Sequence, residues 1–281
     1  MVVKIMGGLG NQLFIYAFGY ALFKEKNCDN LLLDTVNYDI YDGPKFVLDY
    51  FNIEASTRFI SANKILIESP ILYKLYYHLK IRFRNIKIFK ERELFLLEQD
   101  VFNQKDKTLF IGYWQNYRYF DKYRQDIVRQ FRLKVVSDNL EDALLKLDNH
   151  CVAVHVRRGD YKTYRGGKCL SIDYYKHTMD VCYEKDNQVK FFIFSDDEEY
   201  CKVKFEKYNV VIVSEQHDFS DIEEFVFMSS FRRFIIANST FSWWAAYISN
   251  SCDVYAPVVD MWRDQFYPPK WKRILAKIEN I

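Results

Sequence analysis

The sequence predicts an α/β protein with a parallel sheet, and its second half gives the clearest signal. Short apolar runs, each the length of a buried strand, alternate there with segments of helical length. The expected strands are 151–156, 191–194, 209–213, 234–237 and 253–256, and the expected helices lie near 172–184, 197–207, 219–231 and 241–249. Because parallel strands need crossover connections, this order predicts a Rossmann-like domain of five strands and four helices.

The first half of the chain is less regular but also indicates an α/β unit. Its expected strands are 2–6, 31–34 and 109–114, with a helix over 11–26. We place the domain boundary at residue 140, so that the domains are 1–140 and 141–281. For the end of the chain, one option is a last helix that packs back on the N-terminal domain.

The composition sets limits on the function. Of the 281 residues 49% are apolar, enough for a substantial core, and the net charge of +2 gives no global basic bias toward nucleic acid. The 24 Phe and 22 Tyr suit a carbohydrate-handling protein and an aromatic core equally well. We therefore expect a globular protein that does not bind nucleic acid.

Cysteine usage and the chain start predict a cytoplasmic location. The six cysteines form no CxxC pair and no Cys/His cluster with zinc spacing, so we expect reduced, buried thiols. The stretch MVVKIMGGLGNQ lacks the apolar core of a signal peptide, because Lys4 interrupts it. The sequence contains no run of 18 apolar residues, the length that a membrane-spanning helix needs.

Residues 72–93 form a basic segment in which aromatic and apolar residues alternate with charge. Its basic residues are Lys74, Lys80, Arg82, Arg84, Lys87, Lys90 and Arg92. Such a segment can lie on an anionic membrane surface, here the inner membrane face. The alternative, which we favour, is a solvated helix whose apolar face packs on its own domain.

The strand CVAVHV ends in the stretch HVRRGDY, which places Arg157, Arg158 and Asp160 at its carboxyl end. Ligands of open parallel sheets bind outside this edge. An arginine fork grips phosphate oxygens through charge-assisted hydrogen bonds. One arginine is therefore a candidate to bind phosphate and the other to anchor Asp160 or the loop, although a structural Arg–Asp bridge is an equal alternative.

Two further strand ends carry polar side chains. After 191–194 come Ser195, Asp196 and Asp197, suited to a guanine edge or a ribose hydroxyl, or to a plain helix cap. After 234–237 comes a turn with more hydroxyl groups than one cap needs, where a helix N-terminus can bind an anion. Its candidate residues are Asn238, Ser239, Thr240 and Ser242. Together the three strand ends predict a nucleotide-diphosphate site.

The stretch GGLGNQL follows the first strand. Its spacing matches neither a GxGxxG motif nor a P-loop. Gly8 and Gly10 would allow close approach of a ligand to the backbone, and Asn11 and Gln12 offer side-chain hydrogen bonds at a helix start. The simpler interpretation is a tight strand–helix turn.

No D-x-D pattern occurs in the chain. Many metal-dependent sugar transferases hold a divalent ion against the diphosphate with that pattern. Its absence predicts that no metal is bound and that Arg157 and the helix start near Ser239 provide the positive charge.

The chain closely resembles the bacterial α-1,2-fucosyltransferases of glycosyltransferase family 11 in four stretches. From the N-terminus these are GGLGNQLFIYA, HVRRGDY, FSDD and ANSTFSWWAAY. The resemblance extends from residue 5 to about 268. It implies a GT-B fold, GDP-β-L-fucose as donor, inversion at the anomeric carbon, and no metal or cofactor. The implied acceptor is a terminal β-galactoside in a surface glycan such as O-antigen or lipopolysaccharide.

The resemblance also implies residue roles. Its H-x-R-R-x-D motif falls on His155, Arg157, Arg158 and Asp160. Arg157 would contact the diphosphate; His155, Asp196 and Asp197 would lie near guanine and ribose. Ser239, Thr240 and Ser242 would line the phosphate side, and GGLGNQ would face the interdomain cleft. Ile15 departs from the family, which commonly has Gln there.

Two roles remain open at this point. Asp160 is a candidate general base for the acceptor hydroxyl, or it orients Arg158 through a salt bridge. The activity itself has two competitors: transfer of another GDP-linked sugar through the same nucleotide site, and a glycan-binding protein without catalysis. The sequence does not define the acceptor glycan or the oligomeric state.

Overall fold

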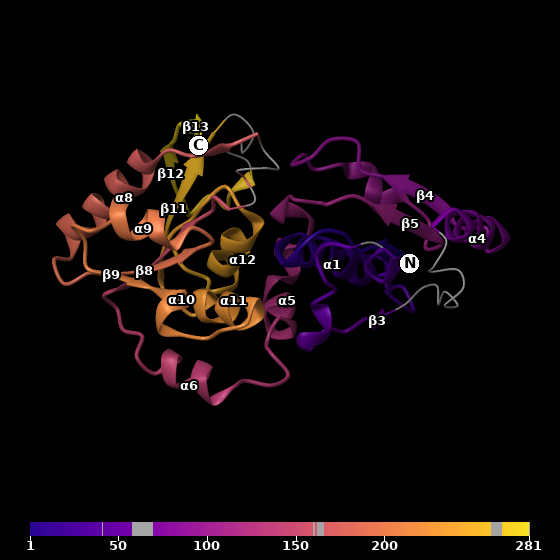
Figure 1. The fold of residues 1–281 in the computed structure, drawn as a ribbon. Helices are drawn as coiled ribbons and strands as arrows, with labels where there is room; N and C mark the ends of the chain where they lie inside the picture. The colour runs from indigo at the N-terminus through magenta and orange to yellow at the C-terminus, as the bar shows by residue number, and fades with distance from the viewer. Residues whose placement is uncertain (41, 58–69, 160, 162–165, 260–265, 281) are drawn as a thin grey trace. The chain divides into compact units, whose positions relative to one another are not determined.

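The protein is described from a computed structural model that covers residues 1–40, 42–57, 70–159, 161, 166–259 and 266–280. The chain forms two compact units, Met1–Lys134 and Val135–Ile281 (Figure 1). The division precedes the predicted boundary at residue 140 because α6 (Asp138–Leu144) belongs to unit 2. Ser137, which caps α6, donates a hydrogen bond of 2.5 Å to Glu223 in the core of that unit's helical layer.

Unit 1 contains a five-stranded parallel sheet in the order β3-β2-β1-β5-β4. Its strands are β1 (Val2–Lys4), β2 (Leu32–Asp34), β3 (Ser56–Thr57), β4 (Lys87–Lys90) and β5 (Thr108–Ile111). Its α-helices are α1 (Leu9–Glu25), α2 (Asn37–Ile40), α4 (Pro70–Phe83) and α5 (Arg124–Gln130), with 3-10 turns η1 (Leu48–Tyr50), η2 (Gln99–Asn103), η3 (Tyr117–Tyr119) and η4 (Asp121–Tyr123). The first-half prediction missed β3 and β4, two short strands at the sheet edges.

Adjacent residues of β1 fix the two faces of this sheet. Val3 packs against Gly19 of α1, where an added Cβ would lie only 2.8 Å from the valine side chain. Val2 faces the other way and packs with Tyr77 and Ile81 of α4. The period of two along the strand therefore places α1 and α4 on opposite faces.

Unit 2 contains a six-stranded parallel sheet in the order β12-β11-β10-β6-β8-β9. Its strands are β6 (Cys151–Val156), β8 (Lys190–Ser195), β9 (Val210–Ile212), β10 (Arg233–Ile235), β11 (Asp253–Val258) and β12 (Lys272–Leu275), and a separate antiparallel pair joins β7 (Lys168–Leu170) to β13 (Ile278–Asn280). Its remaining helices are α8 (Ile172–Lys185), α9 (Glu198–Lys204), α10 (Val213–Gln216), α11 (Asp221–Ser229) and α12 (Thr240–Ile248). The five predicted strands and four predicted helices are confirmed.

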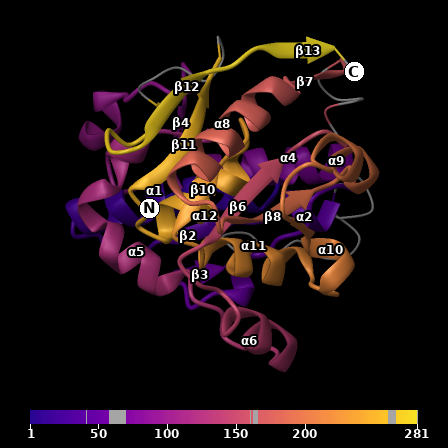
Figure 2. The same ribbon diagram turned by 90° about the vertical axis from the view of Figure 1, so that its left-hand side faces the viewer.

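Helices cover both faces of this sheet (Figure 2). Phe192 and Phe194 of β8 contact Phe231 at the end of α11, with ring centroids 5.2 and 5.8 Å apart. Phe191, on the opposite face, contacts Tyr208, which follows α9. Strands covered on both faces are apolar throughout, as the six buried residues of β6 show.

The option of a last helix is wrong for the described residues. After Pro268 and Pro269 the chain forms β12, which pairs in parallel with β11 and extends the unit 2 sheet. β13 then returns to pair with β7. Proline has no backbone N–H to donate within a helix, so two consecutive prolines disfavour a helix that runs through them. The end of the chain belongs to unit 2.

Two other expectations concern cysteines and membrane spans. All six cysteines are unpaired; Cys151, Cys169, Cys182 and Cys201 are buried, whereas Cys28 and Cys252 are at least partly exposed. None of the helices that the structure describes has both the length and the apolar character needed to cross a bilayer.

Candidate functional site

The candidate site lies at the side of the unit 2 sheet where its parallel strands end, including β6 and β10. We call this side the carboxyl edge, and the side where the strands begin the amino edge. These strands are neighbours, but the chain leaves them in opposite directions: β6 leads to β8 on one side and β10 to β11 on the other. Such a reversal of strand order opens a crevice between the two connecting loops. The residues after β6 and after β10 therefore flank the position where this fold binds ligands.

Asp196 holds the loop after β6 in place. Its Oδ1 accepts hydrogen bonds of 2.8 Å from the backbone N–H groups of Arg158 and Gly159, and its Oδ2 lies 2.9 Å from Nη1 of Arg157. Gly159 is needed here, because a Cβ at this position would lie 2.9 Å from the Asp196 carboxyl carbon. The loop conformation thus depends on one carboxylate at the end of β8.

The two arginines have different surroundings. Nε of Arg158 lies 3.1 Å from Oδ2 of Asp197, and its guanidinium stacks 3.5 Å from the ring centre of Tyr200. Its side chain is 12% exposed, against 35% for Arg157. Arg158 is therefore the anchor of the loop, and Arg157 is the arginine that solvent or a ligand can reach.

Ser195, the last residue of β8, also helps to position the loop after β6. Its hydroxyl accepts a 3.0 Å hydrogen bond from the backbone N–H of Asp197, which orients the carboxylate toward Arg158. Ser195, Asp196 and Asp197 thus act together as a scaffold for the arginine loop. Their described partners are protein groups, and the expected contacts with guanine and ribose stay a prediction.

A second scaffold joins β6 to the start of α12. Ser239 is the N-cap of α12, and its Oγ accepts from the N–H of Phe241 at 3.4 Å. Ser242, one turn on, lies with its Oγ 2.8 Å from Nδ1 of His155 and accepts from the N–H of Ala237 at 3.3 Å. The hydroxyl-rich turn is thereby tied to β6, and Thr240 occupies the first helical position at the mouth of the turn.

His155 is a neutral imidazole in this setting. Burial, reinforced by the positive charge of Arg157, lowers the pKa of His155 to about 3. A neutral ring adds no positive charge to the site and keeps one nitrogen as an acceptor. His155 therefore positions α12 through Ser242 rather than binding an anion by charge.

Asn238 has an unusual position between β10 and α12. It is buried, and its Oδ1 has no hydrogen-bond partner among the described residues. Its backbone carbonyl accepts a 2.9 Å hydrogen bond from the hydroxyl of Tyr161. A buried unpaired acceptor costs about 1–3 kcal/mol, so a ligand donor at this point would be favoured.

Glu224 on α11 interacts electrostatically with Asp196 and Arg157, and the motif analysis missed it. Burial raises its pKa to about 7, and the nearby carboxylates of Asp221 and Asp196 add to the rise. The positive charge of Arg157 acts against this rise, and a carboxyl with a pKa near 7 can accept or release a proton near neutral pH. One signal in the sequence could have pointed to Glu224. The capping box at the start of α11 pairs Ser220 with Glu223, and this pairing does not account for the neighbouring Glu224.

With this geometry established, comparison with known proteins identifies the family. The family model described as Glycosyl transferase family 11 matches residues 1–276. The chain belongs to glycosyl transferase family 11. The resemblance inferred from its motifs is thus confirmed, and the protein is a bacterial, fucosyltransferase-like enzyme of this family.

Two Escherichia coli proteins are similar to this family 11 transferase over most of its length. One is an alpha-1,2-colitosyltransferase, 32% identical over 274 residues, with 89% of this chain and 88% of the relative covered. The other is the O-antigen biosynthesis glycosyltransferase WbnK, 28% identical, with 87% and 89% covered. Among solved structures, that of a mutant of Arabidopsis thaliana FUT1 in complex with GDP has a TM-score of 0.50 at 12% identity, covering 89% of this chain and 68% of that one. The fold is accordingly the two-domain GT-B type.

The glycine-rich stretch of this family 11 transferase lies in unit 1, at the start of α1. Gly8 is the N-cap of α1 and Gly10 is buried in its first turn. The backbone that demands glycine is that of Gly7, with φ of 72°. The stretch is thus the tight strand–helix turn of the simpler interpretation.

Gln12 and Asn11 are occupied inside unit 1. Gln12 is fully buried; its amide donates to the carbonyls of Gly7 and Lys45, at 3.0 and 2.7 Å, and accepts from the N–H of Val47 at 2.9 Å. Oδ1 of Asn11 accepts a 2.7 Å bond from Gln115. Gln12 therefore joins the start of α1 to the segment around residues 45–47, and its predicted ligand contact stays a prediction.

Asp160, predicted as a catalytic residue of this transferase, lies outside the described residues. Ile15, the departure from the family pattern, is fully buried in α1. Packing within unit 1 therefore accounts for an apolar residue at that position. Among the described residues, no cluster of three His, Cys, Asp or Glu side chains is placed to hold a metal ion.

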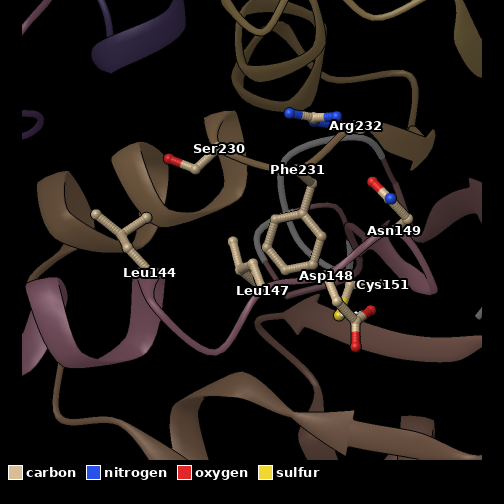
Figure 3. A pocket seen from close by; sticks show the side chains of 8 residues that line it. All are labelled: Leu144, Leu147, Asp148, Asn149, Cys151, Ser230, Phe231 and Arg232. Atoms are coloured by element: carbon tan, nitrogen blue, oxygen red, sulfur yellow. Dashed lines mark hydrogen bonds between the residues drawn. The ribbon is translucent and has the colours of Figure 1, made fainter.

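An open cavity of about 520 Å³ lies at the opposite edge of the unit 2 sheet (Figure 3). Its lining residues lie before or at the amino ends of β6 and β10: Leu144, Leu147, Asp148, Asn149, Cys151, Ser230, Phe231 and Arg232. Because the cavity lies at the amino ends of these strands, it is separate from the site around Arg157.

Proposed function

We propose that the protein transfers L-fucose from GDP-β-L-fucose to the 2-OH of a terminal β-galactoside in a bacterial surface glycan, such as O-antigen or lipopolysaccharide. The proposed reaction inverts the anomeric carbon and uses no metal. One observation carries the proposal: the exposed guanidinium of Arg157 and the N-terminus of α12 flank the point where strand order reverses. Family membership and the O-antigen enzyme among its relatives support it.

The diphosphate is the part of the donor that this site suits best. The helix start presents backbone N–H groups and the positive end of the helix dipole to an anion. A charge-assisted hydrogen bond from Arg157 would contribute about 1.5–3 kcal/mol. Arg158 is already committed to Asp197 and Tyr200, so in our proposal it supports the loop without touching phosphate.

The reaction is a single displacement. The galactose O2 attacks the anomeric carbon as the bond to the β-phosphate oxygen breaks, and GDP leaves from the opposite face. Negative charge grows on that phosphate in the transition state, so groups that neutralise it lower the barrier. Arg157 and the α12 amides are the proposed groups.

The acceptor proton has two proposed destinations. Asp160, from the H-x-R-R-x-D motif, is the first, and its alternative role is to orient Arg158. Glu224 is the second, because its pKa of about 7 suits proton transfer near neutral pH. If Asp160→Asn removes the fall in rate at low pH that protonation of a general base causes, Asp160 is favoured as the base. An unchanged pH–rate profile with weaker donor binding would favour the orienting role.

In this proposal the remaining predicted residues position the others. His155, Ser195, Asp196 and Asp197 fix the arginine loop and α12, and Asn238, Ser239 and Thr240 line the phosphate side. We propose that unit 1 provides the acceptor side and that the enzyme works in the cytoplasm. A Bos taurus galactoside 2-alpha-L-fucosyltransferase, 26% identical over 51% of this chain and 43% of its own length, supports galactoside as acceptor.

Transfer of colitose is the second candidate. It is favoured by the Escherichia coli colitosyltransferase, which is 32% identical over nearly the whole chain. The same nucleotide site would serve both sugars, because Arg157 and α12 contact the diphosphate rather than the sugar ring. Competition between GDP-fucose and GDP-colitose for one acceptor separates the two, and the preferred donor is the one with the higher kcat/KM.

The test is a transfer assay with GDP-fucose and a panel of β-galactosides, followed by linkage analysis of the product. We expect an α-1,2 linkage and activity unaffected by a metal chelator. Arg157→Ala should lower turnover roughly 100-fold or more, whereas Arg232→Ala, at the opposite sheet edge, should not. Near-normal turnover of folded Arg157→Ala, or activity lost to a chelator and restored by manganese, would contradict the proposal. A protein that binds glycans but neither transfers nor hydrolyses the donor would be the non-catalytic relative.

A further inference from the structure

The helix α4 has two apolar faces, and only one of them is covered by the residues that the structure describes. Tyr77 and Ile81 point into unit 1, where they are buried against Val2, Val36 and Leu109. The hydroxyl of Tyr77 also donates a 2.5 Å hydrogen bond to the carboxylate of Asp34. These contacts fix the rotation of α4 about its own axis and hence determine which side chains face outward.

The outward face carries five large apolar side chains. Their exposed fractions are 81% for Ile71, 51% for Leu72, 58% for Leu75, 43% for Leu79 and 85% for Phe83. At 3.6 residues per turn they fall within an arc of about 120° on the side away from Tyr77 and Ile81. We call these five residues the α4 outer face. A single exposed leucine needs no explanation, but a contiguous apolar stripe marks an interaction surface.

Basic residues lie within and beside the α4 outer face and continue into β4. Residues 70–90 contain Lys74, Lys80, Arg82, Arg84, Lys87 and Lys90 and no Asp or Glu. By helical spacing Lys80 lies beside the stripe and Arg82 lies within its arc, next to Phe83 in the last turn. Nζ of Lys80 lies 4.8 Å from the ring centre of Tyr76. Lys87 and Lys90 are exposed on β4, the edge strand of the sheet.

We propose that the α4 outer face and the basic residues around it dock this chain on an anionic phospholipid surface. An apolar stripe flanked by Lys and Arg is the pattern of a helix that lies in the plane of a membrane interface. The leucines and Phe83 would enter the acyl boundary while the basic groups contact the headgroups. Figure 1 shows α4 at the periphery of unit 1.

The charge pattern selects a lipid surface over a second copy of this chain. A symmetric dimer through α4 would bring two copies of the same six cations together, and like charges at an interface oppose association. An anionic bilayer neutralises all of them at once. The inference is independent of the donor sugar and goes beyond the proposed reaction.

The experiment is sedimentation of the full chain with vesicles of phosphatidylcholine, with or without 30 mol% phosphatidylglycerol, an amount of the order that gives a strongly negative surface. Two triple variants remove the surface: Leu75→Ser, Leu79→Ser, Phe83→Ser; and Lys80→Gln, Arg82→Gln, Lys87→Gln. Matched controls change exposed residues elsewhere: Val135→Ser, Leu145→Ser, Leu275→Ser; and Lys105→Gln, Lys146→Gln, Lys207→Gln. Thermal unfolding and transfer to a soluble acceptor check that each variant is folded.

We expect the parent chain and both controls to bind anionic vesicles, and binding to fall at least tenfold on neutral vesicles or in high salt. Both α4 variants should also bind at least tenfold more weakly, with activity on the soluble acceptor retained. The single variant Phe83→Ser is the fallback if a triple variant unfolds. Parent protein that ignores anionic vesicles, α4 variants that bind like the parent, or a parent dimer that the apolar variant dissociates would overturn the proposal.

Discussion

At the residue scale, Asp196 is the group on which the arginine loop depends. It is a carboxylate placed 2.9 Å from the arginine that we expect to bind phosphate. Its charge alone would repel a diphosphate, yet its hydrogen bonds hold the backbone of Arg158 and Gly159 in place. The two effects have opposite signs, so a single substitution distinguishes them.

We predict that Asp196→Ala weakens GDP binding roughly tenfold, because the lost anchoring outweighs the removed repulsion. Calorimetric titration with GDP measures the change. Glu199→Ala, which removes an exposed carboxylate from α9, is the control and should leave the affinity unchanged. Tighter binding by the Asp196 variant would show that the carboxylate acts through repulsion and not through position.

Glu224 gives a prediction about pH. Its folded pKa of about 7 exceeds the ordinary value of 4.5, so the folded state holds the proton more tightly than the unfolded state. The stabilisation is fully present below pH 4.5 and is lost as pH rises through 7. Glu224→Gln keeps a neutral side chain at every pH and should escape this loss.

We therefore expect Glu224→Gln to gain roughly 1–2 kcal/mol of unfolding free energy over the parent protein at pH 8, after allowance for partial exposure, and little at pH 4.5. Urea unfolding at the two pH values measures the difference. Glu184→Gln, an exposed glutamate on α8, should show no such pH dependence. An equal effect of Glu224→Gln at both pH values would rule out a raised pKa.

At the element scale, the start of α12 is held by one buried hydroxyl. Ser242 connects the first turn of α12 to His155 on β6 and to the backbone of Ala237. The hydroxyl of Ser249, at the other end of the same helix, donates to the carbonyl of Ala246 and accepts from the N–H of Ser251, so both of these contacts are local in the chain. The two serines thus share a helix but differ in what they hold together.

We predict that Ser242→Ala lowers unfolding free energy by about 1–3 kcal/mol, because buried partners lose their hydrogen bonds. It should also weaken GDP binding severalfold, since the N-terminus of α12 is no longer fixed against β6. Ser249→Ala should change stability by a few tenths of a kcal/mol and leave GDP affinity intact. Thermal unfolding with and without GDP measures both quantities; a GDP affinity unchanged in Ser242→Ala would sink the positioning role.

At the scale of the whole molecule, the carboxyl and amino edges of the unit 2 sheet are two alternative places for a nucleotide to bind. The carboxyl edge carries Arg157 and the start of α12, whereas the amino edge carries the cavity beside Phe231. A nucleotide attracted by positive charge and helix amides belongs at the carboxyl edge. The cavity's size does not by itself make it the donor site.

Hydrogen exchange in the presence of GDP tests this choice. We expect added protection in 155–159, 194–198 and 237–243 and none in 144–151 or 229–232. Protection confined to the second group would relocate the donor site to the cavity. The protein without GDP supplies the reference rates for each segment.

Sequence periodicity predicted most of unit 2, and in unit 1 it predicted β1, β2, β5 and α1 but missed β3 and β4. The apolar runs of β6, β8 and β11 are buried on both faces, and this makes them continuous and easy to detect. β3 and β4 are short edge strands with few apolar residues, so they carry no such pattern. β12 has the sequence KRIL, which has no long apolar run, and its strand conformation is stabilised by pairing with β11.

The sequence by itself determined the parallel α/β architecture of unit 2, the family and the strand ends that carry the candidate site, because these depend on local periodicity and on motifs read in order. Only the tertiary structure decided how the charges pair. It assigned Arg158 to Asp197 and Tyr200, turned Asp196 toward Arg157, buried Gln12 and brought Glu224 to the site. Hydrogen bonds and pKa values arise between residues tens of positions apart, so they follow from packing and not from spacing along the chain.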